Sequence, residues 1–135
     1  MSKIANYLRS HIAGSVSTRA DWRASVSADA GILAATPELV VVPRVVSDIR
    51  KITRFAWQMA EKGHRIPVVT RGAGCGALGG AVGQGILLDT AALDTIFEYD
   101  GKSQRVRVQP GVPAHSVAAA LSMHGAGVGP LTSQR

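Results

Sequence analysis

The sequence predicts an α+β fold with α/β character, in which a βαβ unit of short parallel strands is flanked by helices and followed by a β-hairpin. Two observations lead to this prediction. Short runs of Val, Ile and Leu alternate with a helical pattern, which is typical of parallel strands joined by a crossover helix. Only six of the 135 residues are aromatic, so the core must depend on aliphatic side chains, unlike that of a β-sandwich.

The first 36 residues are expected to form an N-terminal helical extension. Apolar residues recur at four-residue spacing after a possible Ser cap, which predicts a short amphipathic helix over residues 2–12. Residues 21–30 mix Ser, Ala and Asp without a firm period. A further helical turn around Trp22 therefore remains open.

From position 37 the pattern changes to strand, helix and strand. The apolar run Leu39–Val42 is closed by Pro43 and predicts a buried strand. A helix capped by Ser47 or Asp48 should end at Gly63. Its expected inner face is formed by Ile49, Ile52, Phe55, Ala56 and Met59. Residues 66–70 form the next strand, which should run parallel to the first because such crossovers join parallel strands.

The second half of the chain predicts a third strand, a hairpin and a last helix. Residues 85–89 form a short apolar run. Residues 95–99 and 105–109 are expected to pair around the turn at Asp100 and Gly101, since the second segment alternates Arg and Val. Residues 114–124 follow as a helix with Gly125 as its C-cap.

Composition and charge exclude several classes of protein. The net charge is +6, with the basic residues scattered along the chain, so nucleic-acid binding is not expected. A single cysteine, Cys75, excludes an internal disulfide. The N-terminus lacks the apolar core of a signal peptide and no stretch is long enough to span a bilayer, so we expect a cytoplasmic protein. The His and carboxylate residues show no ligand spacing and no paired acid and base, so no catalytic or metal-binding residue is predicted.

Residues 71–81 form a glycine-rich stretch directly after a predicted strand. Glycines there let the backbone turn sharply or approach a ligand closely, and successive exposed N–H groups form an anion nest that favours phosphate over a plain connector loop. Residues 74–79 match the dinucleotide fingerprint G-x-G-x-x-G. The following glycines make a helix unfavourable by about 1 kcal/mol each, which excludes a Rossmann site, and no Lys-Ser or Lys-Thr completes a P-loop.

Five motifs in order resemble one known family. They are Pro-Glu-Leu-Val-Val-Val-Pro-Arg followed by Val-Ser-Asp-Ile, Ile-Pro-Val-Val-Thr-Arg-Gly-Ala-Gly, Leu-Gly-Gly-Ala, Gly-Ile-Leu-Leu-Asp and Val-Gln-Pro-Gly-Val. Over residues 37–125 they resemble the FAD-binding domain of the vanillyl-alcohol oxidase and p-cresol methylhydroxylase (PCMH) family of FAD-linked oxidases, particularly its glycolate oxidase and D-lactate dehydrogenase-like members. The resemblance assigns residues 37–135 to the N-terminal part of a PCMH-type FAD-binding domain.

The resemblance implies FAD as the cofactor and assigns its contacts. Backbone amides of the diphosphate loop would bind phosphate, namely Gly72, Ala73, Gly74, Cys75 and Gly76. Small residues Gly79, Gly80 and Ala81 would let the cofactor lie close, and Pro43, Pro110 and Gly111 would line the adenine or ribose side. Arg71 would supply positive charge, or else make a salt bridge or stay solvated. Cys75 departs from the usual hydroxyl residue or flavin-linked histidine, and is interpreted as a small tolerated side chain or, alternatively, a redox-active or flavin-linked thiol.

The family's later segments, which complete the FAD site and bind substrate, have no counterpart after Gly125. We therefore expect a truncated member that is not catalytically complete alone and that needs a missing C-terminal portion or a partner subunit, or associates with itself. The implied function is FAD binding within an FAD-dependent oxidoreductase acting on 2-hydroxy acids such as glycolate or lactate. The alternative is a non-catalytic interaction module that kept the fold and lost the cofactor.

Overall fold

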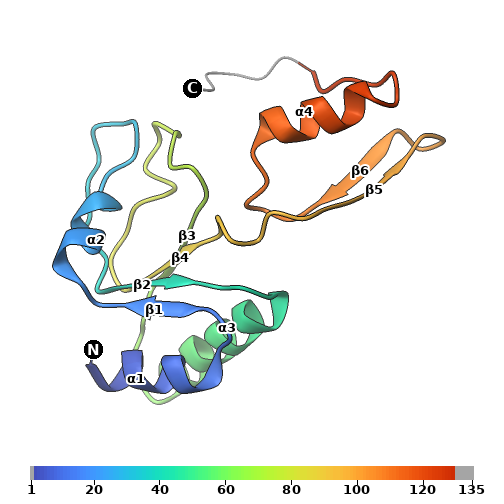
Figure 1. Ribbon diagram of the computed structural model, residues 1–135. Helices are drawn as coiled ribbons and strands as arrows, with labels where there is room; N and C mark the ends of the chain where they lie inside the picture. Colours follow the sequence, from blue (N-terminus) through green and yellow to red (C-terminus); the bar gives the residue numbers. More distant parts are fainter. Residues whose placement is uncertain (1, 130–135) are drawn as a thin grey trace.

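A mixed four-stranded sheet lies at the centre of the computed structural model, which describes residues 2–129 (Figure 1). The strands are β1 (Ser15–Ser17), β2 (Leu39–Val42), β3 (Val68–Arg71) and β4 (Ile86–Asp89), in the spatial order β1-β2-β4-β3. β4 runs parallel to both β2 and β3, whereas β1 pairs antiparallel with β2. The parallel strands end at one edge of the sheet, and the glycine-rich stretch leaves from β3 at that edge.

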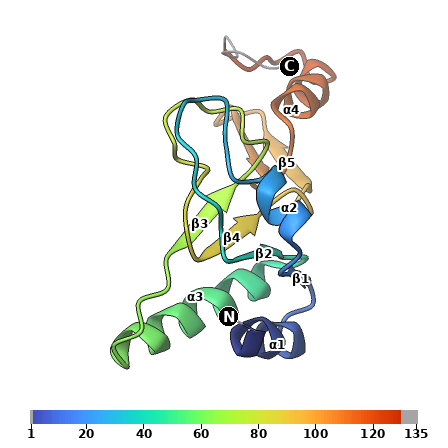
Figure 2. The same cartoon turned by 90° about the vertical axis from the view of Figure 1, so that its left-hand side faces the viewer.

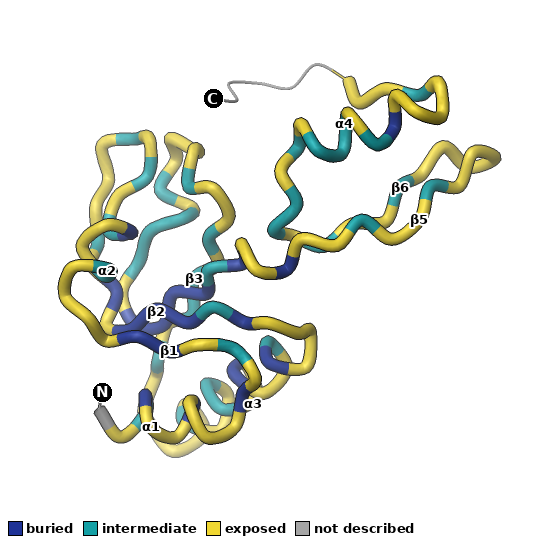
Figure 3. The backbone as a smooth tube through the Cα atoms, in the orientation of Figure 1, coloured by how far each residue is buried: buried dark blue, intermediate teal, exposed yellow. Residues whose placement is uncertain are grey.

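Two helices cover one face of the sheet and a shorter helix lies on the other (Figure 2). α1 (Ser2–His11) and α3 (Val46–Glu61) pack against Leu39, Val41, Ile86 and Leu88, while α2 (Ala20–Ser25) lies on the side of Val40 and Leu87. Alternate residues of β2 and β4 therefore point to opposite faces and both faces are covered, as expected for buried parallel strands. In Figure 3 the buried residues concentrate in these two strands.

The predicted βαβ unit is confirmed, with β4 lying between its two parallel strands. The predicted cap of its helix is wrong. Val45 is the N-cap, and Asp48 lies three residues inside, where its carboxylate accepts the amides of Arg44 and Val45. The expected inner face of α3 is buried or half-buried, with Ile52 fully buried. β3 begins at Val68 instead of residue 66, because Pro67 has no N–H to donate to a ladder.

The N-terminal segment holds elements that its sequence did not indicate. β1 is absent from the sequence prediction, because only one of its three residues, Val16, is apolar. The helical turn left open around Trp22 is present as α2. After α2 the chain forms a loop, residues 26–35, closed by a bridge between Ala28 and Ala34. Both Figures 1 and 2 show this loop rising beside the glycine-rich stretch.

The last part of the described chain extends away from the sheet (Figure 1). The predicted hairpin is present as β5 (Ile96–Asp100) and β6 (Arg105–Val108), and α4 (Ala114–Ser122) lies beside it. Leu121 is buried and borders the same hollow as Tyr99 and Val106 of the hairpin, and the rings of Tyr99 and His124 lie 5.2 Å apart. Among the helices of residues 2–129, none has the length and apolar character needed to cross a membrane.

Candidate functional site

The glycine loop, residues 72–85, connects β3 to β4 and presents a row of free backbone donors. The amides of residues 72–78 donate to no protein acceptor within the described part of the chain. Most of these residues are exposed, and only Gly74 among them is half-buried. Because unpaired backbone N–H groups need an acceptor, this row can bind water or an anion.

Arg71, the last residue of β3, holds the base of this loop. Its Nη1 donates to the carbonyl oxygens of Ala28 at 2.8 Å, of Val26 at 3.4 Å and of Ala81 at 3.4 Å. A Cβ on Gly74 would lie 2.3 Å from its Nη2, so the guanidinium rests directly against the loop backbone. Arg71 therefore places a positive charge beneath the loop and connects it to residues 26–28.

A hollow of about 460 Å³ separates the start of the glycine loop from the start of α4. It brings together four residues predicted from the sequence, which are Gly72, Ala73, Pro110 and Gly111. The hollow is also lined by Ala91, Asp94, Val112, Pro113 and Ala114, which sequence reasoning did not single out. Residues separated by about forty positions in the chain thus border a common space.

The wall of this hollow is connected to β3 by hydrogen bonds. Thr90 follows β4, and both its amide and its Oγ1 donate to the carbonyl oxygen of Arg71, at 2.9 and 3.2 Å. Gly111 packs against the same turn, since a Cβ there would lie 2.1 Å from the Thr90 carbonyl oxygen. Gly111 also donates its amide to Leu93 at 2.8 Å. Only glycine fits this close backbone approach.

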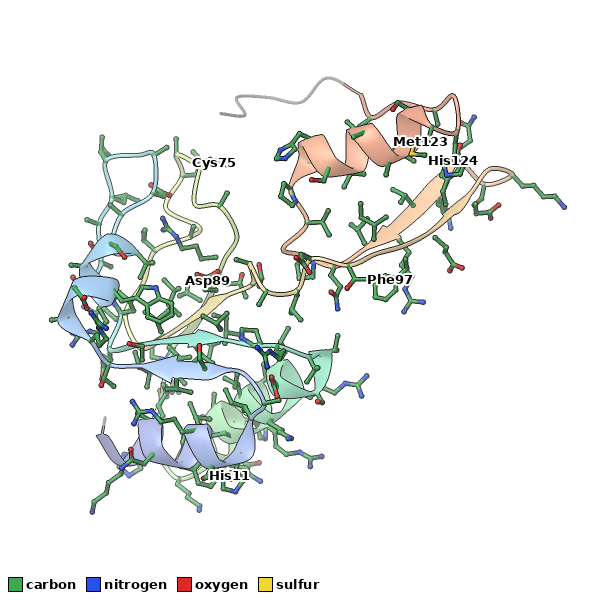
Figure 4. All side chains as sticks on the ribbon, in the orientation of Figure 1. His11, Cys75, Asp89, Phe97, Met123 and His124 are labelled. Carbon is green, nitrogen blue, oxygen red and sulfur yellow. The ribbon has the colours of Figure 1, made fainter. Side chains whose placement is uncertain are left out.

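The remaining predicted residues lie elsewhere. Pro43 is fully buried at the end of β2 and does not line the hollow. Gly79, Gly80 and Ala81 lie in the second half of the loop, where Gly79 faces Leu33 and donates its amide to Asp29, and Ala81 accepts a hydrogen bond from Arg71. The thiol of Cys75 is free and exposed, at the end of the loop remote from the sheet (Figure 4).

Asp29 is a contact residue of the loop that sequence reasoning missed. Its segment has no regular period, and only the Asp-x-Gly spacing of Asp29 and Gly31, typical of a turn, gave a local signal. Its contact with Gly79 joins residues 50 positions apart, which no local pattern reveals.

Charged groups with a shifted pKa lie outside the hollow. Burial alone would raise the pKa of Asp48, but the amides of Ala13, Arg44, Val45 and Gly14 donate to its carboxylate and lower that pKa below its ordinary value. Hydrogen bonds from Arg19 lower the pKa of Asp21 in the same way. Among residues 2–129 no group of three or more His, Cys, Asp or Glu side chains could hold a metal ion.

The family model described as FAD binding domain matches residues 37–135. The glycolate oxidase subunit GlcD of Escherichia coli (strain K12) is 37% identical over 90 residues, which are 65% of this chain and 17% of that protein. The D-2-hydroxyglutarate dehydrogenase of Haemophilus influenzae is 30% identical over 116 residues, or 85% of this chain and 11% of that protein. The chain thus spans less than a fifth of these relatives.

Solved structures share the fold. An alkyldihydroxyacetonephosphate synthase matches with a TM-score of 0.76 at 12% identity, covering 96% of this chain and 26% of that one. p-Cresol methylhydroxylase with substrate bound matches with a TM-score of 0.72 at 18% identity. The match covers 92% of this chain and 25% of that one. 6-Hydroxy-D-nicotine oxidase from Arthrobacter nicotinovorans matches with a TM-score of 0.67 at 23% identity. The match covers 84% of this chain and 24% of that one. The predicted fold class is confirmed.

Proposed function

The chain belongs to the FAD binding domain family, whose cofactor is FAD, and we propose that its glycine loop binds the FAD diphosphate within an oxidoreductase that acts on a 2-hydroxy acid. The observation that carries this proposal is the row of exposed amides over residues 72–78, which lack protein acceptors in the described chain. Phosphate oxygens accept such hydrogen bonds well, and the charge of the anion strengthens them.

The glycines of the loop support the proposal that a ligand lies close to the loop backbone. A Cβ on Gly72, Gly76 or Gly80 would meet nothing within 4 Å, and none of these residues has a positive φ. Neither internal packing nor backbone conformation therefore requires glycine at these positions. A ligand that lies against the backbone does require it, and the donor set of the loop fits a diphosphate.

The chain's own residues would bind and orient the cofactor, while bound FAD supplies the hydride-accepting chemistry. Amides of Gly72, Ala73, Gly74, Cys75 and Gly76 would donate to the phosphate oxygens of the cofactor. Arg71 holds the loop from beneath, and its charge favours an anion above it. The positive end of α4 borders the same hollow and acts in the same direction.

The adenine or ribose would lie along Pro110 and Gly111, which line the hollow beside the loop. Gly79, Gly80 and Ala81 would leave room along the far part of the loop. In this proposal Pro43 does not contact the cofactor directly, because its ring is buried at the end of β2.

The substrate class rests on the relatives. Glycolate and 2-hydroxyglutarate, which appear in their names, are both 2-hydroxy acids. Because the chain matches 17% and 11% of those proteins, we propose that substrate contacts and the rest of the FAD site come from further polypeptide or a partner subunit. A cytoplasmic location is part of the same proposal and rests on the lone cysteine, since disulfides are rare in the cytosol.

The proposal is tested by titrating FAD with the chain and following flavin fluorescence. Gly76→Val fills space that is open in this structure and should weaken binding at least about tenfold, since it separates phosphate from donors that contribute about 1.5–3 kcal/mol each. Gly127→Val is the matched control, because its Cβ also meets nothing and it lies outside the loop. Equal affinity of the two variants, or a folded wild-type chain that ignores high micromolar FAD, contradicts the proposal.

A second candidate is the non-catalytic interaction module. It is favoured by large apolar side chains left exposed on the hairpin and directly after α4, where Phe97 is 51% and Met123 is 87% accessible. Exposed apolar side chains of this size are common at protein interfaces. A folded chain that binds no FAD but associates through these residues, as measured by analytical ultracentrifugation of Phe97→Ser and Met123→Ser, would support this candidate.

A further inference from the structure

The loop of residues 26–35 lies beside the glycine loop in both views of the fold (Figures 1 and 2), yet it precedes the family match at residue 37. We propose that this loop is part of the cofactor site and that Asp29 is a positioning residue, which sets the shape of the diphosphate loop and thereby the affinity for FAD. This inference rests on the proposed function and adds a residue outside the matched domain.

The carboxylate of Asp29 joins the two loops. Its Oδ2 accepts the amide of Gly79 at 2.9 Å, and its Oδ1 accepts the amide of Gly31 at 2.8 Å. Both oxygens are therefore engaged by backbone donors, in short charge-assisted hydrogen bonds. Gly79 has a φ of +76°, and the bond to Asp29 holds this residue at the point where the loop turns back.

Contacts on either side of Asp29 hold the rest of the glycine loop. Ala30 donates its amide to the carbonyl oxygen of Gly76 at 3.1 Å. Gly31 lies so close to Ala77 that a Cβ there would be 2.3 Å from its carbonyl oxygen. At the other end, the carbonyl of Ala28 accepts from Arg71.

These contacts leave the phosphate-facing donors free. The 26–35 loop uses the carbonyl of Gly76 and the amide of Gly79, whereas the amides of residues 72–78 remain without protein acceptors among the described residues. A glycine-rich loop has high conformational entropy when unrestrained, and a ligand that must order it binds more weakly. The neighbouring loop therefore preorganises the donors before the anion arrives.

The negative charge of Asp29 acts against this effect. A carboxylate close to a diphosphate repels it, but the two amides that it accepts disperse part of its charge. We expect preorganisation to dominate, since the carboxylate holds the far end of the loop and leaves the 72–76 amides to the anion. The two effects predict opposite changes in affinity when Asp29 is removed.

The experiment compares FAD affinity in Asp29→Ala, Asp29→Asn and the wild-type chain by flavin fluorescence. Asp29→Ala should weaken binding about tenfold, which equals about 1.4 kcal/mol. Asp29→Asn should recover part of this loss, because its single oxygen keeps one of the two hydrogen bonds. Asp100→Ala is the matched control, since Asp100 accepts one amide, that of Lys102, and one hydroxyl in a remote turn.

A second measurement separates loop order from loss of folding. Without FAD, hydrogen exchange at the Gly79 amide should be faster in Asp29→Ala than in the wild type, while exchange in β2 and β4 stays unchanged. Wild-type affinity or tighter binding in Asp29→Ala overturns this inference alone, as does an equal loss in Asp100→Ala. Absence of FAD binding by the folded wild type overturns the proposed function, so the two failures are distinguishable.

Discussion

Replacing Asp48 by Ala should destabilise this chain more than any other single carboxylate change within the described residues. Its side chain is fully buried and accepts amides from Ala13 at 2.9 Å, Gly14 at 3.0 Å and Arg44 at 3.0 Å, with a longer bond from Val45 at 3.4 Å. At about 1 kcal/mol for each of the three short bonds to part-buried amides, the expected loss is about 3 kcal/mol. For a domain of this size that lowers Tm by about 10 °C.

The assay is urea and thermal unfolding followed by circular dichroism, with Asp100→Ala as the control in an exposed turn. The pH dependence adds an independent check. Because the pKa of Asp48 is lowered in the folded chain, its contribution is fully present above the ordinary value of 3.8 and is lost as pH falls through the lower folded value. Asp48→Asn should therefore lose less stability than the wild type below about pH 4. Equal destabilisation by Asp48→Ala and Asp100→Ala would refute the reasoning.

Three further predictions concern the site. Gly74→Val should weaken FAD binding and also lower Tm, since its Cβ would displace the Arg71 guanidinium and Gly74 has a φ of +70°; flavin fluorescence and thermal melting measure the two effects. Gly111→Ala should lower the free energy of unfolding by about 2 kcal/mol in urea titrations, because its Cβ would lie 2.1 Å from the carbonyl oxygen of Thr90. Alkylation of Cys75 should be slowed by saturating FAD, whereas Cys75→Ser should bind FAD as the wild type does, and an unchanged alkylation rate would place the cofactor away from the loop.

The sequence predicted the elements whose signal is local. The apolar runs of β2 and β4 and the periodic face of α3 follow from burial alone, so their positions agree with the structure to within a residue or two. β1 could not be predicted in this way, because Ser15–Ser17 forms a strand only through its pairing with β2. The predicted cap of α3 is wrong because Asp48 accepts the amides of Arg44 and Val45 from the third helical position, and its further bonds from Ala13 and Gly14 come from far away in the chain.

In the candidate site, too, local signals were predictable from the sequence and contacts between distant residues were not. Glycine content and position after β3 predict an anion-binding loop, which stays a prediction, while Gly72, Ala73, Pro110 and Gly111 do meet at one hollow. What holds the loop in shape could not be predicted, because it comes from side chains that cross between loops. The sequence predicts that Arg71 supplies charge to phosphate, makes a salt bridge or stays solvated, whereas its guanidinium donates to three backbone carbonyls.

Residues 2–36 contribute core side chains, a strand and a loop contact to this unit, which is more than a helical extension would supply. Four of the nine buried residues in the main core cluster, Ala5, Leu8, Ile12 and Val16, precede the family match at residue 37. The same segment supplies the edge strand β1 and the loop that carries Asp29. α1 covers one face of the parallel strands, β1 pairs along their edge, and residues 26–35 hold the diphosphate loop. We therefore propose that residues 2–36 are integral to the cofactor-binding unit. The position of the FAD donors is then set by tertiary contacts from both sides of the glycine loop, and the loop sequence alone is not sufficient to form the site.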